Sequence, residues 1–364
     1  MKLLQVFKAI NATETSLALS LARRPDIELT VMCSMDCQNH RRLLEAGIPV
    51  RPLDFRSNLD LPAMRRLRRE LSQHRHHLVH AFTSRTIAGS LMATSWMWKR
   101  PAVVAYRDIM DRIRRYDPVS WMTFMHPRLA AISCISNSCR QGLQLSGIKR
   151  PLLRTIHLGY VPSPSEDCSF AQFGVPENAF VAAFVGDIRP LKGVDVLMEA
   201  ARGLRDLDDL HFLLMGQVRD PRVVKLAGAA ELRDRVHLAG HVPHAQRLLE
   251  GASLFVMPSR KEGLCKSVME AMARGVCPII SNVGGMPELV RHERDGLVVP
   301  AGRPDELAAA IRRLHGDDQL RRSCAASAQQ RILEEFSIAR MTERTCQLYL
   351  EVLGQANPAH KLAA

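Results

Sequence analysis

Short apolar runs alternate with longer amphipathic stretches along the whole chain. The runs that predict buried strands lie at residues 2–7, 27–33, 50–53, 77–82, 103–106, 131–136 and 152–159, and then at 180–185, 210–215, 236–238 and 255–257. Between most of them the sequence has room for a helix of ten or more residues. This alternation predicts an α/β fold with parallel sheets.

A polar segment with two prolines divides the runs into two series. Residues 160–167 contain Pro162 and Pro164 among polar and acidic neighbours, which is typical of an interdomain linker. A chain of 364 residues is long enough for two domains, each with its own core. We therefore expect an N-terminal domain at 1–160, a C-terminal domain at 161–337, a helix at 338–353 and a disordered tail at 354–364.

The stretch from residue 256 to 300 has the most defined pattern: strand, loop, helix, strand and Gly-rich turn. Pro258 ends its first apolar run, because proline cannot donate to a central ladder. A polar loop follows. An amphipathic helix then starts at Ser267 and ends at Gly275, a usual C-terminal cap.

Two carboxylates in this stretch, Glu262 and Glu270, are separated by seven residues. With Glu262 in the loop and Glu270 one turn into the helix, both point into the crevice beyond the strand's carboxyl end, where open α/β sheets place their ligands. A carboxylate there accepts two sugar hydroxyls at once, and the nearby helix N-terminus favours a phosphate. Taken alone, two glutamates at this spacing favour another interpretation, in which Glu262 is a solvated loop residue and Glu270 a surface residue of a helix.

The order of motifs in this stretch resembles the donor-site signature of the retaining glycosyltransferases of family 4. The matching elements are Pro258-Ser259, Glu262 with Glu270, Ala271-Met272-Ala273, Gly284-Gly285 with Glu288, and Gly296-Leu297-Val298. The resemblance implies the GT-B fold: two Rossmann-like domains with parallel sheets facing a central cleft, and the helix at 338–353 packed back on the first domain.

The same resemblance implies a function, the transfer of a hexose from a nucleotide sugar with retention at the anomeric carbon. Glu270 is then expected to hold the ribose and Glu262 a hexose hydroxyl, with Gly263, Leu264 and Cys265 beside the donor. A UDP- or GDP-linked sugar is the expected donor. Neither a metal ion nor a further cofactor is expected.

After the strand at 180–185, the sequence Gly186-Asp187-Ile188-Arg189-Pro190-Leu191-Lys192-Gly193 resembles the family's Gly-Arg-x-x-x-x-Lys-Gly element. In the family, the arginine and the lysine of this element grip the donor diphosphate. Lys192 matches, whereas Asp187 stands at the arginine position. We expect Arg189 to take over that role, since arginine contacts phosphate in a bidentate manner and lysine acts as a point charge.

Two more turns are expected at the nucleotide. Gly216 follows the strand at 210–215, and Gly240-His241-Val242-Pro243 follows the next strand. The second of these resembles the family's nucleotide-base pocket. We expect Gly216, His241 and Val242 to contact the donor; for His241 an ordinary loop histidine is the alternative.

The first domain matches the family less well. Its first turn, residues 9–12, lacks the glycine that members often carry, and Arg107 stands where many have a histidine near the reacting carbon. The Arg107 guanidinium is expected either to contact donor phosphates or acceptor, or to signal weakened chemistry. The loop at 109–127 combines cations with aromatic rings that suit a glycan or lipid acceptor, a mobile surface loop being the alternative: Arg112, Arg114, Arg115, Trp121, Phe124 and His126.

The formal net charge of +13 is confined to the first half of the chain. Residues 1–160 carry 25 Lys and Arg against 11 Asp and Glu, whereas the remainder carries 25 against 26. Such a one-sided positive charge favours an anionic partner. Binding to an anionic membrane surface gains about 1 kcal/mol per well-placed cation. The most basic helix, 62–76, is expected to be a membrane patch or a solvated face, and His74, His76, His77 and His80 are expected to form an exposed helix end.

Other classes of protein are disfavoured. With 5% aromatic residues and no nucleic-acid-reading motif, a nucleic-acid partner is not expected. No run approaches the ~20 apolar residues of a membrane span, and no signal-peptide pattern is present. Nine irregularly placed cysteines argue against a disulfide framework.

We therefore expect a cytoplasmic enzyme in peripheral contact with the inner membrane surface, acting on a glycan or anionic glycolipid. The resemblance includes members that build lipopolysaccharide or other cell-surface glycans. Two alternatives remain open: a nucleotide-sugar epimerase of the same fold, and a catalytically inactive GT-B partner subunit. Asp187 and Arg107 favour the inactive subunit.

Overall fold

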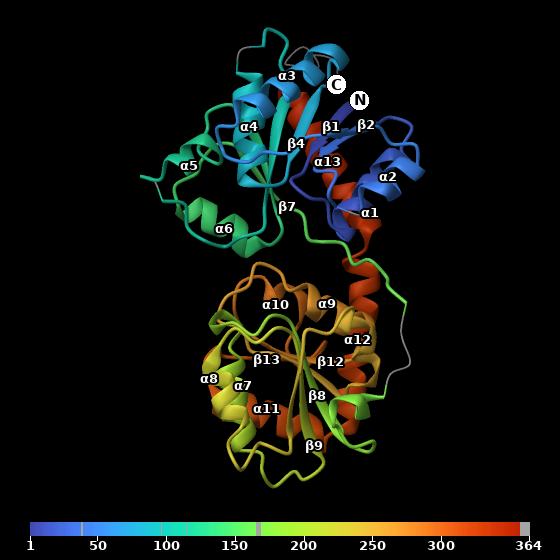
Figure 1. Ribbon diagram of the computed structural model, residues 1–364, viewed down its shortest axis with the longest axis vertical. Helices are drawn as coiled ribbons and strands as arrows, with labels where there is room; N and C mark the ends of the chain where they lie inside the picture. Colours follow the sequence, from blue (N-terminus) through green and yellow to red (C-terminus); the bar gives the residue numbers. More distant parts are fainter. Residues whose placement is uncertain (38, 96, 115, 165–168, 357–364) are drawn as a thin grey trace. The chain divides into compact units, whose positions relative to one another are not determined.

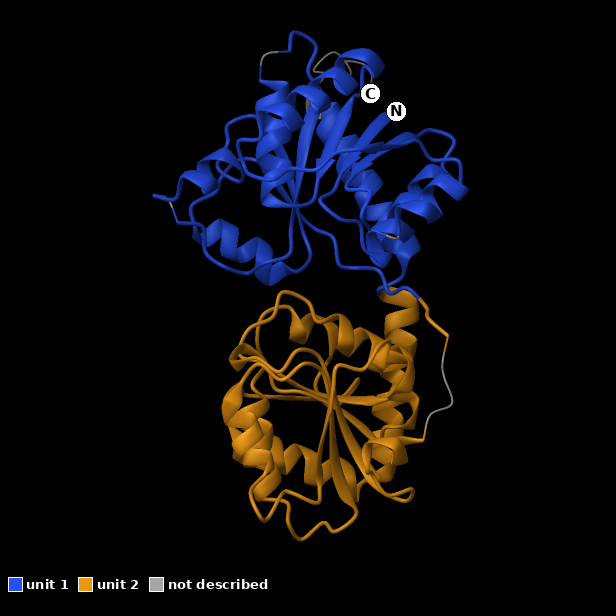
Figure 2. Ribbon diagram, viewed as in Figure 1, with its two compact units in different colours: residues 1–161, 336–364 blue, residues 162–335 orange. Residues whose placement is uncertain are grey.

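The computed structural model describes residues 1–364 with the exception of 38, 96, 115, 165–168 and 357–364 (Figure 1). It divides into two compact units, unit 1 with Met1–Val161 and Phe336–Ala364, and unit 2 with Pro162–Glu335 (Figure 2). Part of the expected linker and most of the expected tail lie outside the described residues. Among the described helices, none has the length and apolar character needed to cross a membrane.

Unit 1 is built on a seven-stranded sheet in the order β3-β2-β1-β4-β5-β6-β7, with every neighbouring pair parallel. Consecutive residues of its central strands are buried, as in β4, where all four positions are inaccessible. A parallel sheet covered on both faces requires such continuous apolar runs, which is why the sequence pattern located these strands. The bounds are β1 Lys2–Val6, β2 Glu28–Cys33, β3 Val50–Pro52, β4 Leu78–Ala81, β5 Ala102–Arg107, β6 Leu129–Cys134 and β7 Leu152–Thr155.

The helices of unit 1 begin at polar caps. Asn11 caps α1 through a capping box with Glu14, and Asp60 caps α3 through the Ala63 N–H, each satisfying backbone donors that the first turn leaves unpaired. The helices are α1 Ala12–Ala22, α2 His40–Glu45, α3 Leu61–His74, α4 Ser84–Thr94, α5 Pro118–Met122, α6 Asn137–Leu145 and α13 Ile338–Ala356. Helix α13, the last in the chain, packs against α1 and the sheet of this unit.

The histidines expected at an exposed helix end are in part buried. His80 is 1% exposed, and its Nδ1 lies 2.7 Å from the hydroxyl of Tyr349 on α13. Burial lowers the pKa of His80 to about 3, so the ring is neutral. His76 is also buried, with Nε2 3.3 Å from Glu70. The expectation failed because His80 faces α13, an element 269 residues away.

Unit 2 has a six-stranded sheet in the order β10-β9-β8-β11-β12-β13, again parallel throughout. Its strands are β8 Phe180–Val185, β9 Leu210–Met215, β10 Val236–Gly240, β11 Leu254–Met257, β12 Cys277–Ser281 and β13 Leu297–Val299. Its helices are α7 Val194–Arg202, α8 Pro221–Ala227, α9 Lys266–Ala273, α10 Met286–Leu289, α11 Pro304–Gly316 and α12 Asp318–Glu335, with short 3-10 turns at Phe170–Phe173, Pro190–Lys192 and Ala245–Gly251.

Each sheet has one point at which the chain reverses its direction of travel across the strands. In unit 1 this switch point lies between β1 and β4, and in unit 2 between β8 and β11. The loops after the two strands at a switch point diverge to opposite sides, which opens a crevice at the carboxyl ends. The two loops of unit 2 are the ones that carry Lys192 and Glu262.

Candidate active site

Lys192 and Glu262 meet at the switch point of unit 2. The Lys192 Nζ lies 2.5 Å from Glu262 Oε1, and the Ser259 hydroxyl donates to the same oxygen at 3.1 Å. Both charged side chains are mostly shielded from solvent, Lys192 being 26% and Glu262 13% exposed. An ammonium has three donors, so Lys192 retains the capacity to bind an anion while it contacts Glu262.

Burial by itself lowers the pKa of Lys192. The neighbouring Cys265 and Glu262 outweigh this effect, and the pKa is raised overall. The side chain is therefore charged at neutral pH. A fixed cation in a partly desolvated crevice interacts with a phosphate much more strongly than a solvated lysine does.

Two glycines allow the loops of this site to approach closely. Gly193 has a φ of +67°, and a Cβ there would lie 2.0 Å from the Pro258 carbonyl oxygen. At Gly216 a Cβ would lie 1.9 Å from the carbonyl oxygen of Gly186. Only glycine fits at either position. Gly216, expected from the sequence at the donor, thus holds the loop after β9 against the loop after β8.

Glu270 lies in the second turn of α9, which follows the Glu262 loop. Burial raises the pKa of Glu270 to about 7, although Lys266 and Arg274 oppose the shift. Within the described part of the chain, no hydrogen bond or ion pair involves its carboxylate. A desolvated carboxylate without a partner is suited to accept hydroxyl groups, and perturbed groups of this kind gather at functional sites.

The other expected donor residues surround these loops. Gly263 is half-buried between Glu262 and the buried pair Leu264 and Cys265, at the start of α9. His241 is exposed and Val242 half-buried, directly after β10. The Gly216 N–H donates to the Gly240 carbonyl oxygen at 2.7 Å, which brings the loop of His241 beside that of Gly216.

Asp187, which stands at the family's arginine position, is paired with two arginines in the structure. The Asp187 carboxylate pairs with Arg189 at 2.7 Å and with Arg219 at 3.2 Å, and the hydrogen bond from Arg189 is the main cause that holds the pKa of Asp187 below its usual value. Arg189, which is 55% exposed, therefore contacts Asp187 in this structure. Arg219 was missed at the sequence level, although it follows the strand and turn that end at Gly216.

In unit 1, Arg107 organises the loop that follows β5. Its guanidinium donates to the carbonyl oxygens of Ile109 at 2.8 Å and Asp111 at 2.6 Å, and it lies 4.6 Å from the centre of the Phe124 ring. Phe124 was expected among the aromatic rings available to an acceptor, but it is 5% exposed beneath Arg107. Tyr116 and Trp121, at 98% and 53%, are the exposed aromatic residues of this loop, which contains α5. Arg115 lies outside the described residues.

Comparisons with known proteins agree with the division into units. A family described as glycosyl transferases group 1 matches residues 165–331, and one described as Glycosyltransferase Family 4 matches residues 15–163. Among solved structures, that of Anabaena Alr3699/HepE in complex with UDP resembles this chain in fold, with a TM-score of 0.77, 19% identity and coverage of 96% of this chain and 100% of that one. Each unit of this chain thus matches a glycosyltransferase family, and the chain has the fold of the GT-B glycosyltransferases.

The curated relatives match this chain over part of its length. The alpha-D-kanosaminyltransferase of Streptomyces kanamyceticus is 31% identical over 50% of this chain and 48% of the relative. The alpha-maltose-1-phosphate synthase of Mycolicibacterium smegmatis is 32% identical over 52% of each. The chain thus spans about half the length of the curated relatives it matches.

Several residues that shape the candidate site could not be recognised from the sequence. The motif order includes Ser259 only as part of a Pro-Ser pair and does not point to Arg260 or Asp195. A signal was present for Asp195, since an acidic residue two places after Gly193 lies in the first turn of a helix, where it is favoured. No sequence signal pointed to Arg260, because its partners are 65 and 70 residues away.

Proposed function

We propose that this chain transfers a hexose from a nucleotide sugar to a glycan or glycolipid acceptor, with retention at the anomeric carbon. The observation that carries the proposal is the Lys192–Glu262 pair at the switch point of unit 2. It combines a shielded cation, suited to a diphosphate, with a carboxylate suited to sugar hydroxyls. The glycosyltransferase family models matched to both units support the same reaction class.

In the proposed reaction, negative charge develops on the departing nucleoside diphosphate. Lys192 stabilises this charge, with Arg189 and backbone N–H groups near Gly263 as further donors, and no bound metal ion takes part. Preorganised groups of this kind usually supply the largest catalytic contribution. Glu262 orients the hexose, and Glu270 accepts the two ribose hydroxyls. UDP- and GDP-linked sugars are the donors to test first; that Anabaena Alr3699/HepE was solved with UDP supports beginning with UDP.

The acceptor is proposed to bind at the loop after β5. This loop joins exposed apolar residues, Ile109, Tyr116 and Trp121, to the exposed cations Arg112 and Arg114. A glycolipid with an anionic head group is complementary to both kinds of side chain. We propose that the same loop makes a peripheral contact with an anionic membrane, as in lipopolysaccharide or other cell-surface glycan synthesis.

A second basic surface of unit 1 lies at the opposite edge of the sheet. A groove at the amino ends of β1, β4 and β5 is lined by Arg75, Lys99 and Arg100, and by Trp98, which is 98% exposed. If the membrane contacted this groove, the loop after β5 would lie at the opposite edge of the sheet, away from the membrane. Binding to vesicles of phosphatidylglycerol separates the two surfaces: Arg112→Ala/Arg114→Ala is expected to weaken binding, and Lys99→Ala/Arg100→Ala to leave it nearly unchanged. The reverse result would reject the loop as the membrane contact.

One other function is favoured by specific observations. Arg107 is engaged with carbonyl oxygens of its own loop, and Asp187 reverses the charge of a family arginine. Both fit an inactive partner subunit that has kept the fold.

Thermal stabilisation by UDP, GDP, ADP and CMP decides between the two functions. A nucleotide at 100 times its dissociation constant adds roughly 2.7 kcal/mol to stability. We expect one of the four to stabilise the wild type, and Glu270→Ala to lose most of that effect. Glu306→Ala, an exposed glutamate of α11, is the matched control. No stabilisation by any nucleotide, together with no hydrolysis of UDP- or GDP-sugars, would favour the inactive subunit.

A further inference from the structure

Arg260 connects the two loops that carry Lys192 and Glu262. Its guanidinium donates to both oxygens of Asp195, at 2.6 and 2.8 Å, and to the Pro190 carbonyl oxygen at 2.8 Å. Its backbone N–H donates to the Leu191 carbonyl oxygen at 2.8 Å. One residue of the Glu262 loop thus makes four contacts with the segment that begins at Pro190 and ends in the first turn of α7.

These contacts lie next to the residues of the proposed chemistry. Arg260 is two positions before Glu262 and adjacent to Ser259, which donates to Glu262. Pro190 and Leu191 immediately precede Lys192. Any change in the separation of the two loops therefore changes the distance between the Lys192 ammonium and the Glu262 carboxylate.

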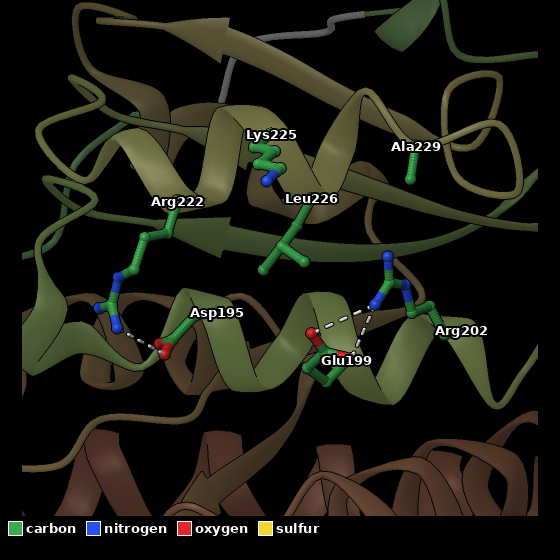
Figure 3. A pocket seen from close by; sticks show the side chains of 7 residues that line it. All are labelled: Asp195, Glu199, Arg202, Arg222, Lys225, Leu226 and Ala229. Atoms are coloured by element: carbon green, nitrogen blue, oxygen red, sulfur yellow. Dashed lines mark hydrogen bonds and ion pairs between the residues drawn. The ribbon is translucent and has the colours of Figure 1, made fainter.

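The partner of Arg260 is well defined. Asp195 is 16% exposed and receives a bidentate contact, a geometry that is directional as well as strong. Arg222 of α8 lies farther away, 3.7 Å from Asp195, and makes its closer pair, at 2.7 Å, with Asp220. Figure 3 shows Asp195 and Arg222 facing each other across the groove between α7 and α8.

We propose that Arg260, held by Asp195, is a positioning residue of the donor site: it sets the separation of the Lys192 and Glu262 loops and thereby aligns the nucleotide diphosphate with the sugar. This inference rests on the proposed function. Arg260 does not contact the reacting groups itself; its effect passes through the loop backbone at Pro190 and Leu191.

The test compares Arg260→Met with a matched variant, Arg312→Met. Arg312 of α11 makes a similar bidentate pair with Asp206, with its Nη2 at 2.7 Å, in the same unit but away from the donor loops. UDP affinity is measured by calorimetry, and kcat and KM with UDP-glucose. We expect Arg260→Met to weaken UDP binding and lower kcat/KM by about tenfold, the usual scale of coupling between contacting groups, and Arg312→Met to change neither.

A double-mutant cycle separates positioning from a direct contact with the donor. In a Lys192→Met background, Arg260→Met is expected to cost UDP affinity little more, because the cation that it positions is gone. Losses that add independently would overturn the proposal, as would unchanged UDP affinity in Arg260→Met alone.

A readout without ligand keeps the inference distinct from the proposed function. The amide of residue 260 persists in Arg260→Met, and its hydrogen exchange reports the bond to Leu191. We expect faster exchange at residues 259–263 in Arg260→Met and Asp195→Asn, and no change in Arg312→Met. Unchanged exchange would overturn the proposal that Arg260 holds the two loops together. If these variants show the exchange effect but the wild type binds no nucleotide, the proposed function is overturned and the role of Arg260 in holding the loops is kept.

Discussion

The switch points of the two sheets differ in chemistry, although the sheets share their parallel arrangement. In unit 2 the crevice between β8 and β11 holds Lys192, Glu262 and Ser259, linked by short polar contacts. In unit 1 the residues that follow β1 and β4 are Phe7 and Phe82, whose rings stack at 4.1 Å. The same fold thus presents charge in one unit and a closed aromatic contact in the other.

We infer from this difference that unit 2 is the unit suited to bind phosphate. Phe7 and Phe82 are 1% and 6% exposed, so buried aromatic rings occupy the positions that directly follow β1 and β4 in unit 1. The exposed cations that we propose for the acceptor, Arg112 and Arg114, lie on the loop after β5. The donor is therefore proposed for unit 2, where the site is preformed, and the acceptor for the loop of unit 1.

Removing the Lys192 ammonium of unit 2 should have the largest effect on catalysis. Lys192→Met is expected to lower kcat by about 10²–10³, the usual cost of losing one group that stabilises transition-state charge. Steady-state kinetics with UDP-glucose measure it, and Lys225→Met on α8 is the control. A kcat within a few fold of the wild type would remove Lys192 from the proposed mechanism and erase the electrostatic contrast between the units.

Glu270 should affect nucleotide binding and stability in opposite directions. Because its pKa of about 7 lies above its ordinary 4.5, the folded protein binds this proton more tightly than the unfolded chain does. The stability that the protonated Glu270 side chain contributes is therefore lost as pH rises from about 4.5 to 7. At about pH 8, Glu270→Gln without ligand should melt higher than the wild type, by 2–4 °C for each kcal/mol relieved in roughly this size of unit.

The same titration predicts how binding depends on pH. The ionised carboxylate accepts two ribose hydroxyls, so wild-type affinity for UDP should rise between about pH 6 and 8. Glu270→Gln should bind more weakly and lack this rise. Because UDP titrates equally in both experiments, the difference between the two calorimetric pH series isolates Glu270. Parallel series would show that Glu270 does not contact the nucleotide.

A substitution at the aromatic switch point of unit 1 tests the opposite expectation, that this switch point does not bind the nucleotide. Phe82→Leu keeps the site apolar but loses the ring contacts to Phe7 and Tyr106, worth about 0.5–1.5 kcal/mol per aromatic pair. Chemical denaturation should show unit 1 destabilised by this order, while calorimetric UDP affinity stays unchanged. Weaker UDP binding would mean that the unit 1 switch point also serves the donor.

The sequence was sufficient to predict the elements that depend on local pattern. Continuous apolar runs located the strands, and Gly275 marked the end of α9 because a positive φ, here +70°, favours glycine. Helix α12 was missed. Its buried residues Cys324, Ala328 and Ile332 are four apart among polar neighbours, so no broad apolar stripe is visible.

Residues of the candidate site could be selected from the sequence only where they follow a known motif order. Lys192 and Glu262 were both selected from the sequence, but their direct contact was not, because it joins segments 70 residues apart. The same limit hid the Arg260–Asp195 pair and the buried contact of His80 with Tyr349. Side chains that interact across elements leave no periodicity in the chain.

The smallest effect is expected at Arg189, which tests how far the Asp187 reversal has changed the donor loop. Arg189 is 55% exposed and contacts Asp187, and an exposed ion pair is worth about 0.2–1 kcal/mol. Arg189→Ala should therefore lower kcat/KM for UDP-glucose only a few fold, well short of Lys192→Met. A loss equal to that of Lys192→Met would mean that Arg189 leaves Asp187 to grip the diphosphate. In that case Asp187→Asn, which releases Arg189, should raise UDP affinity in the same calorimetric assay.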